Sequence, residues 1–278
     1  MKIAVLSGKG GTGKTFVATN LAYSIKNVAY VDCDVEEPNG KLFFNTPVLN
    51  SIPVKRLIPS FDKNLCNGCR KCVDNCHFNA LIYILNRPVI FKEICHACGL
   101  CKQVCPCKAI KEIPENIGVV NTRLYEHVKV IEGILNIGQV SGVNVISKAK
   151  EIGFKEADNI IIDCPPGSGC SVIEAIKDVD YCLAVTEPTS FSFENFKIII
   201  ALAQYLNKPV GIIINKYVED YEPLIEYCNA NKLNVLAKIP YSNNIAKLSG
   251  DGKIVAKYDP ELKNKFIQIF EALLWKKY

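Results

Sequence analysis

A glycine-rich segment near the N-terminus constrains the fold of this chain more than any other feature. Residues 7–15 read S-G-K-G-G-T-G-K-T, which satisfies the spacing G-x-x-x-x-G-K-T. The apolar residues 3–6 precede the segment, and residues 16–26 are compatible with a helix. A phosphate-binding loop requires a strand, a glycine loop and a helix in this order. We therefore expect an α/β fold built around this loop.

The loop predicts a binding site for a nucleoside triphosphate. A helix N-terminus attracts phosphate through its unpaired N–H groups and its partial positive charge. Lys14 is expected to reach the outer phosphates, and the Thr15 hydroxyl is expected to hold Mg²⁺. The residues expected to surround the phosphate oxygens are Gly8, Gly10, Gly11, Thr12 and Gly13. The alternative is a strand-to-helix turn without a ligand.

A second lysine in the loop, Lys9, points to a more specific class. Two lysines beside the glycines would concentrate positive charge unless both meet phosphate or carboxylate groups. The run from Lys9 to Thr15, K-G-G-T-G-K-T, resembles the deviant Walker A loop of the MinD/ParA class of ATPases, which includes the nitrogenase iron protein. The resemblance implies an ATP-dependent homodimer in which Lys9 reaches the partner's nucleotide. The alternative for Lys9 is a solvated surface lysine.

The length and composition of the chain limit where it can act. The 278 residues suffice for one sizeable α/β domain or two modest ones. No uncharged apolar run approaches the roughly 18 residues of a transmembrane helix. The expected strand and glycine loop lie where a signal peptide would be. We therefore expect a cytoplasmic protein.

Acidic residues follow the second expected strand, residues 28–31. Ligands bind at the carboxyl ends of strands in open parallel sheets, so Asp32 and Asp34 are candidates for work on the nucleotide. By the resemblance, Asp34 lies in the first switch and orients the hydrolytic water, while Asp32 supports it. The alternative is an ordinary acidic turn.

Three later segments complete the expected nucleotide site. The run Asp163-Cys164-Pro165-Pro166-Gly167 follows an apolar strand and resembles the second switch of the family, D-x-P-P-G. An Asp here can bind Mg²⁺ through water, and the Gly167 N–H can meet the γ-phosphate. The resemblance further implies that Asn215 pairs with the adenine edge, and that the loop at Pro240 closes over the base. The alternative for Asp163 is a structural residue at a strand end.

Eight of the fourteen cysteines form two runs with identical internal spacing, C-x-x-C-x-x-C-x-x-x-C. This spacing is typical of two-cluster ferredoxins, in which three close thiolates and a distant fourth hold each [4Fe–4S] cube. We therefore assign Cys66, Cys69, Cys72 and Cys105 to one cluster, and Cys95, Cys98, Cys101 and Cys76 to the other. Zinc is the alternative metal for such pairs, but the doubled runs suit cubes better than tetrahedral sites.

Other residues of the cysteine segment raise smaller questions. His77 stands where the pattern places proline, and we expect it to be a tolerated surface residue. Cys107 is expected to be a small buried side chain and not a ligand. The segment also carries a surplus of Lys and Arg. Negatively charged thiolate clusters would offset it, so we expect no nucleic-acid partner.

Cys170 lies seven residues beyond Asp163. In the nitrogenase iron protein, a cysteine at this distance holds a cluster shared between subunits. The resemblance implies a third, intersubunit metal site at Cys170, with Cys164 as a possible second ligand. The alternative is that both cysteines are buried without a ligand.

Together these features predict a P-loop NTPase with a mainly parallel sheet, helices on both faces, and an inserted small α+β ferredoxin-like domain. The expected division is 1–61 and 115–278 for the ATPase domain and 62–114 for the insert, with residues 41–61 irregular. The final helix is expected to lie on the sheet, although 274–277 superficially resemble the membrane-targeting end of MinD. Membrane contact is not expected.

The leading functional hypothesis is an ATPase that couples nucleotide state to electron transfer through two [4Fe–4S] clusters and acts on a redox partner protein. The alternative is an iron–sulfur carrier, like the Mrp-type relatives, that delivers clusters to apo-proteins. Enclosed ferredoxin cubes favour the first, and a labile cluster at Cys170 would favour the second.

Overall fold

A large sheet forms the centre of the molecule. The computed structural model describes residues 1–275, and within them the sheet has nine strands in the order β11-β10-β9-β1-β8-β2-β7-β6-β3. The strands from β11 to β7 are parallel to their neighbours, whereas β6 and β3 are antiparallel. Their bounds are β1 (Lys2–Leu6), β2 (Val28–Asp32), β3 (Asn50–Phe61), β6 (Ile110–Tyr125), β7 (Val128–Leu135), β8 (Asn159–Asp163), β9 (Tyr181–Thr186), β10 (Val210–Tyr217) and β11 (Asn234–Pro240).

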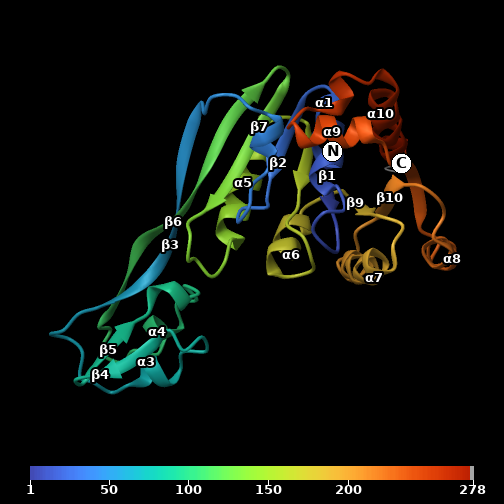
Figure 1. Cartoon of the computed structure of the whole chain (residues 1–278). Helices are drawn as coiled ribbons and strands as arrows, with labels where there is room; N and C mark the ends of the chain where they lie inside the picture. The colour runs from blue at the N-terminus through green and yellow to red at the C-terminus, as the bar shows by residue number, and fades with distance from the viewer. Residues whose placement is uncertain (276–278) are drawn as a thin grey trace.

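Helices cover both faces of this sheet (Figure 1). One face carries α1 (Lys14–Ser24), α9 (Asn243–Gly250) and α10 (Pro260–Trp275), with the short η2 (Val255–Lys257). The opposite face carries α5 (Val143–Glu156), α6 (Cys170–Ile176), α7 (Ser190–Tyr205) and α8 (Glu222–Ala230). The expected parallel sheet with helices on both faces is therefore confirmed.

Strand β1 shows why the sequence forms two cores. Ile3 and Val5 pack into the core beneath α1 and α10, while Ala4 and Leu6 pack into the core beneath α5, α6 and α7. All four side chains are fully buried. Because successive residues of a strand point to opposite faces, a central parallel strand is apolar throughout its length.

Helix α10 lies on the sheet as expected. Its apolar stripe, Leu262, Phe266, Ile269 and Leu273, is buried against α1 and the strands beneath it. Residues 276 and 277, which belong to the membrane-like tail, lie outside the described residues. Among residues 1–275, no helix is both long enough and apolar enough to cross a membrane.

The expectation of irregular structure over residues 41–61 is wrong. Helix α2 spans Gly40–Phe43, and β3 pairs with β6 from Asn50 to Phe61. Pro53 and Pro59 obscured this strand because proline has no N–H for a sheet ladder. Prolines are tolerated in an edge strand, where some N–H groups face away from the sheet. β3 is such an edge strand.

Strands β3 and β6 extend beyond the sheet as a two-stranded ribbon (Figure 1). β6 pairs with β7 from Tyr125 back to Gly118, and its earlier residues pair with β3 alone. Where β6 leaves the sheet, the register between β3 and β6 shifts. Val54 pairs with Gly118 and Lys55 pairs with Asn116, so Ile117 has no partner residue in β3. The residues from Ile110 to Ile117 span roughly 25 Å at about 3.3 Å per residue. The ribbon therefore holds segment 62–109 away from the main body.

Segment 62–109 forms a small unit at the end of the ribbon. It contains the hairpin β4 (Leu81–Ile84) and β5 (Arg87–Ile90), the helical turns α3 (Lys71–Asp74) and α4 (Leu100–Gln103), and η1 (Lys92–Ile94). The sequence repeat is also a backbone repeat, because positive φ angles recur at Arg70 and Gly99 and at Asn79 and Lys108. Strand β6 begins at Ile110, so it crosses the expected boundary at residue 114.

Candidate functional site

The glycine-rich loop connects β1 to α1 and is packed closely on one side. Gly11 and Gly13 have φ angles of 83° and 91°, which side chains other than glycine rarely adopt. A Cβ atom at Gly13 would lie 2.1 Å from Nδ2 of Asn215. That same Nδ2 donates a hydrogen bond of 2.8 Å to the carbonyl of Thr12. The end of β10 therefore fixes the loop where helix α1 begins.

The other side of the loop has room for phosphate. A Cβ atom at Gly10 or Gly11 would meet nothing within 4 Å. Within residues 1–275, the hydroxyl of Thr12 is buried without a hydrogen-bond partner. A buried hydroxyl without a partner is costly, and phosphate oxygens would supply one. The open side, the unpaired hydroxyl and the N-terminus of α1 together fit a nucleotide phosphate.

Lys14, at the start of α1, is buried among carboxylates. Its Nζ donates to Oδ1 of Asp163 at 2.6 Å and lies 4.0 Å from Oδ2 of Asp34. Burial by itself lowers the pKa of Lys14. The charge of Asp163 and its hydrogen bond oppose this effect, and the pKa of Lys14 ends above its usual value. Lys14 is therefore charged, and its charge is balanced here by carboxylates of the same chain.

The two acids after β2 occupy different environments. Asp32 is buried and accepts backbone N–H groups from Gly40 at 2.8 Å and Asp34 at 3.1 Å. Burial and the neighbouring Asp163 hold the pKa of Asp32 well above its usual range. Burial also raises the pKa of Asp34, to about 6, although Lys14 opposes this change. Asp34 is partly exposed, so it is the acid that solvent can reach.

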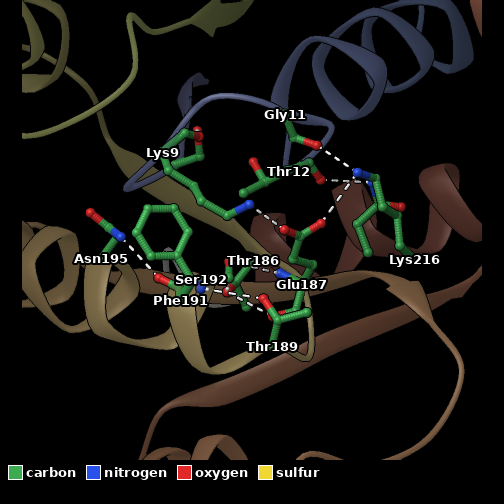
Figure 2. Close-up of polar contacts among 12 residues, drawn as sticks. Lys9, Gly11, Thr12, Thr186, Glu187, Thr189, Phe191, Ser192, Asn195 and Lys216 are labelled. Atoms are coloured by element: carbon green, nitrogen blue, oxygen red, sulfur yellow. Dashed lines mark hydrogen bonds and ion pairs between the residues drawn. The ribbon is translucent and has the colours of Figure 1, made fainter.

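Lys9 is engaged by a carboxylate of its own chain (Figure 2). Its Nζ pairs with Oε1 of Glu187, the residue after β9, and lies 5.5 Å from the centre of the Phe191 ring. Oε2 of the same carboxylate lies 3.2 Å from Nζ of Lys216, which donates to the carbonyl of Gly11 at 2.7 Å. Lys9 is therefore not the freely solvated lysine of the alternative interpretation. Glu187 was missed, although an acid at a strand's carboxyl end was an available signal.

The remaining expected nucleotide residues lie near the same edge of the sheet. The Gly167 N–H donates to the carbonyl of Ser7 at 3.1 Å, and no atom would contact a Cβ there within 4 Å. Pro240 ends β11 and is paired with Tyr217, two residues beyond Asn215. Thr15 occupies the second position of α1 and is partly exposed. The residues expected for nucleotide binding thus gather from β1, β8, β10 and β11.

The eight cysteines of the two runs line two separate hollows in segment 62–109. Cys66, Cys69, Cys72 and Cys105 line one hollow, together with Cys107. Cys76, Cys95, Cys98 and Cys101 line the other. Each hollow therefore combines three cysteines of one run with the fourth of the other run. Thiolates are the ligands of iron–sulfur cubes, so this donor set fits two such groups.

The spacing of the thiols bears on the kind of metal. Among residues 1–275, no three Cys, His, Asp or Glu side chains lie close enough to hold a single metal ion. In a four-iron cube each thiolate binds a different iron, so the sulfur atoms lie farther apart than around one zinc ion.

Arg56 of β3 joins the ribbon to the second hollow. It is buried and donates to the carbonyls of Cys95 at 2.8 Å and Lys92 at 2.7 Å. Its guanidinium also bonds the carboxylate of Glu115 on the paired strand, at 2.8 and 3.0 Å. The sequence analysis missed Arg56 because its partners are distant in the chain.

The structure also places the other cysteines and the histidine that the sequence analysis singled out. Cys107 is partly buried beside the first hollow, and His77 is exposed. Cys170 is exposed at the start of α6, whereas Cys164 is fully buried in the core. Burial holds the pKa of the Cys164 thiol well above its usual range, which disfavours a metal-binding thiolate there. The structure does not bring Cys164 and Cys170 to a common surface.

Comparison with known protein families shows which family the chain belongs to. The description CobQ/CobB/MinD/ParA nucleotide binding domain matches residues 3–255. The chain belongs to this family. The nucleotide-binding character of the loop and its surroundings follows from this membership.

Several relatives have similar sequences. An uncharacterized protein of Methanocaldococcus jannaschii is 29% identical and covers 99% of this chain and 98% of its own length. An iron–sulfur cluster carrier protein of the same organism is 26% identical over 77% of this chain and 59% of its own length. A cytosolic Fe–S cluster assembly factor NUBP1 homolog of Caenorhabditis elegans is 21% identical, over 98% of this chain and 80% of its own length. The relatives of this MinD/ParA family member thus include proteins named as an iron–sulfur cluster carrier and as an Fe–S cluster assembly factor.

Solved structures share the fold. The cell division ATPase MinD of Pyrococcus furiosus superposes with a TM-score of 0.61, at 20% identity, over 98% of this chain and 97% of its own. MinD of Pyrococcus horikoshii complexed with Mg-ADP gives the same score and identity over 98% and 95%. The fold is therefore that of the MinD-like P-loop NTPases.

Proposed function

We propose that this protein is a cytoplasmic, Mg²⁺-dependent ATPase that couples nucleotide state to electron transfer through two [4Fe–4S] clusters. One observation carries the proposal. Two cysteine-lined hollows lie at the end of a ribbon whose base, Gly118 of β6, pairs with Leu135 of β7, and Leu135 in turn donates to the carbonyl of Val35, the residue after Asp34. Backbone pairing through β7 thus connects the nucleotide site to the cluster site.

In this proposal the loop residues Gly8 to Thr15 bind the triphosphate. Lys14 turns from Asp163 towards the phosphates, because phosphate carries more negative charge than a carboxylate. Thr15 and Asp163 hold the Mg²⁺ ion, the second through water. Asp34, the partly exposed acid, orients the attacking water.

Recognition of the base is assigned to the ends of two strands. The Asn215 side chain offers both a donor and an acceptor to the adenine edge. Because its Nδ2 also bonds Thr12, it links the base pocket to the phosphate loop. The segment at Pro240, paired with Tyr217, closes the pocket.

The clusters would be held by Cys66, Cys69, Cys72 and Cys105 in one hollow, and by Cys95, Cys98, Cys101 and Cys76 in the other. When bound, such clusters supply one-electron transfer. Ile58, Ala80 and Ile90 pack against Cys95 and Cys76 of the second hollow. Apolar enclosure limits water access and tunes the potential of a cluster.

A short chain of hydrogen bonds connects the two sites. The carbonyl of Val35, next to Asp34, accepts the N–H of Leu135 at 2.8 Å. Leu135 pairs with Gly118 of β6, where the ribbon leaves the sheet. Ile117, which precedes Gly118 in β6, lies at the register shift between β6 and β3. A bulge of this kind bends a strand. Movement of the Asp34 segment on nucleotide binding would therefore tilt the ribbon and the clusters.

A homodimer across the nucleotide site is part of the proposal. Lys9 would exchange Glu187 for the phosphates of the partner's nucleotide, since both are anionic partners for its ammonium group. Lys9→Ala should bind ATP yet remain monomeric when ATP is added, as measured by light scattering after size exclusion. An ATP-induced dimer of this variant would contradict the cross-subunit role.

The second candidate is delivery of iron–sulfur clusters to apo-proteins, which the names of the carrier relatives favour. The exposed Cys170 is the residue at which a labile intersubunit cluster would form. This candidate would require iron and sulfide to leave the protein.

An anaerobic titration with MgATP tests both candidates. Electron transfer requires MgATP to shift the cluster potential or the EPR signal while the iron content stays constant. Loss of iron to an apo-protein acceptor would establish delivery instead. Protein that contains no iron after reconstitution would contradict both.

A further inference from the structure

We propose that Tyr30 is a positioning residue of the nucleotide site, and that its hydroxyl holds the Asp163 carboxylate in place once Lys14 has turned to the nucleotide. The inference rests on the proposed function, because it concerns the acid assigned to the Mg²⁺ side of the site. It adds a residue that the loop and switch motifs do not include.

The two oxygens of Asp163 have different partners. Oδ1 receives Lys14 at 2.6 Å, and Oδ2 receives the Tyr30 hydroxyl at 2.8 Å. Among the described residues 1–275, the Asp163 carboxylate receives side-chain hydrogen bonds from Lys14 and Tyr30. Lys14 is shared with the phosphates, so its bond is lost or lengthened when a nucleotide binds. The Tyr30 hydroxyl bonds Asp163 and not the phosphate loop, so its bond to Asp163 can remain when a nucleotide binds.

The Tyr30 hydroxyl can act only as a donor here. The residue is fully buried in β2, between β8 and β7. A carboxylate oxygen accepts hydrogen bonds, so the hydroxyl is the donor of this pair. A fixed donor selects one rotamer of the carboxylate and leaves Oδ1 directed to the nucleotide side.

The ring of Tyr30 is itself fixed by the segment that follows the acids of β2. A Cβ atom at Gly40 would lie 2.5 Å from Cε1 of the ring and 2.6 Å from the hydroxyl oxygen. The ring centre of Phe44 lies 4.9 Å from that of Tyr30. Helix α2 and Phe44 thus press on the ring, so the absence of a side chain at Gly40 is what allows the tyrosine to reach Asp163.

Tyr30→Phe removes the hydroxyl and keeps the ring. Tyr23→Phe is the matched control, because Tyr23 is also buried and donates to a carboxylate, Glu126, at 3.1 Å, but at the far end of α1. Binding of a fluorescent ADP analogue is measured in EDTA and in Mg²⁺. We expect Tyr30→Phe to bind the analogue in EDTA as tightly as the wild type. The increase in affinity that Mg²⁺ produces should be about tenfold smaller in Tyr30→Phe, which is the typical effect of one hydrogen bond to a charged group. Turnover should fall through kcat, with KM for ATP little changed.

Gly40→Ala tests the same contact from the other side. The added methyl group displaces the ring, so this variant should lose the Mg²⁺ gain as well. Gly250→Ala is its control, because a Cβ there meets nothing within 4 Å. An undiminished Mg²⁺ gain in Tyr30→Phe, or an equal loss in EDTA and Mg²⁺, would overturn the inference alone. Wild-type protein that binds no nucleotide would overturn the proposed function together with it.

Discussion

Replacing Asp34 by Asn should stabilise the nucleotide-free protein while it abolishes ATP hydrolysis. Burial raises the pKa of Asp34 from 3.8 to about 6, so the folded state disfavours the charged form. Between these two pH values the folded protein holds more protons than the unfolded chain. Stability therefore falls as the pH rises through this window, and the full cost is present above pH 6. Asparagine carries no charge and avoids this cost.

The size of the effect follows from the pKa change. Each pH unit corresponds to about 1.4 kcal/mol, so the upper limit is about 3 kcal/mol. The Asp34 side chain is 21% exposed, and solvent screening reduces the effect to about 1–2 kcal/mol. For a protein of this size that is a rise in Tm of roughly 2–4 °C. The gain should be largest at pH 8 and should shrink by about half at pH 5.

The measurement is thermal unfolding by circular dichroism without nucleotide and under exclusion of oxygen, from pH 5 to pH 8. Glu36→Gln is the control, since Glu36 is an exposed acid of the same segment and should change Tm very little. ATP hydrolysis by each variant is measured in parallel. An unchanged Tm for Asp34→Asn at pH 8, or a gain that grows towards acid, would show that the folded state does not disfavour the charged form of Asp34.

Three further outcomes follow from the site. Asn215→Ala should weaken nucleotide binding by about tenfold, because it removes the bond to the Thr12 carbonyl; an unchanged Kd in calorimetry would contradict this. Cys66→Ser should remove the EPR signal of one cluster and leave the other, whereas Cys107→Ser should leave the iron content unchanged; equal effects would show that the ligand assignment is wrong. Gly13→Ala should abolish nucleotide binding, because a side chain there collides with Asn215 and requires a φ angle of 91°; retained binding in calorimetry would refute the packing of the loop.

Local spacing made much of the fold and the site predictable. The phosphate loop is recognisable because strand, glycines, lysine and helix are neighbours in the chain. The cysteine hollows are similar, since each draws three of its thiols from one short run. The strand at residues 50–61 escaped prediction because its partner, β6, decides that it is a strand, and Pro53 and Pro59 hide the pattern.

The amino-acid sequence by itself determined the α/β class, the nucleotide loop and the grouping of cysteines, because short-range spacing controls each of them. Tertiary structure alone decided which side chains meet across the sheet. Tyr30 reaches Asp163 because β2 and β8 are parallel neighbours, and Lys9 reaches Glu187 because parallel strands align their carboxyl ends at one edge. Such contacts join residues more than a hundred positions apart, and no local pattern encodes the distance between them.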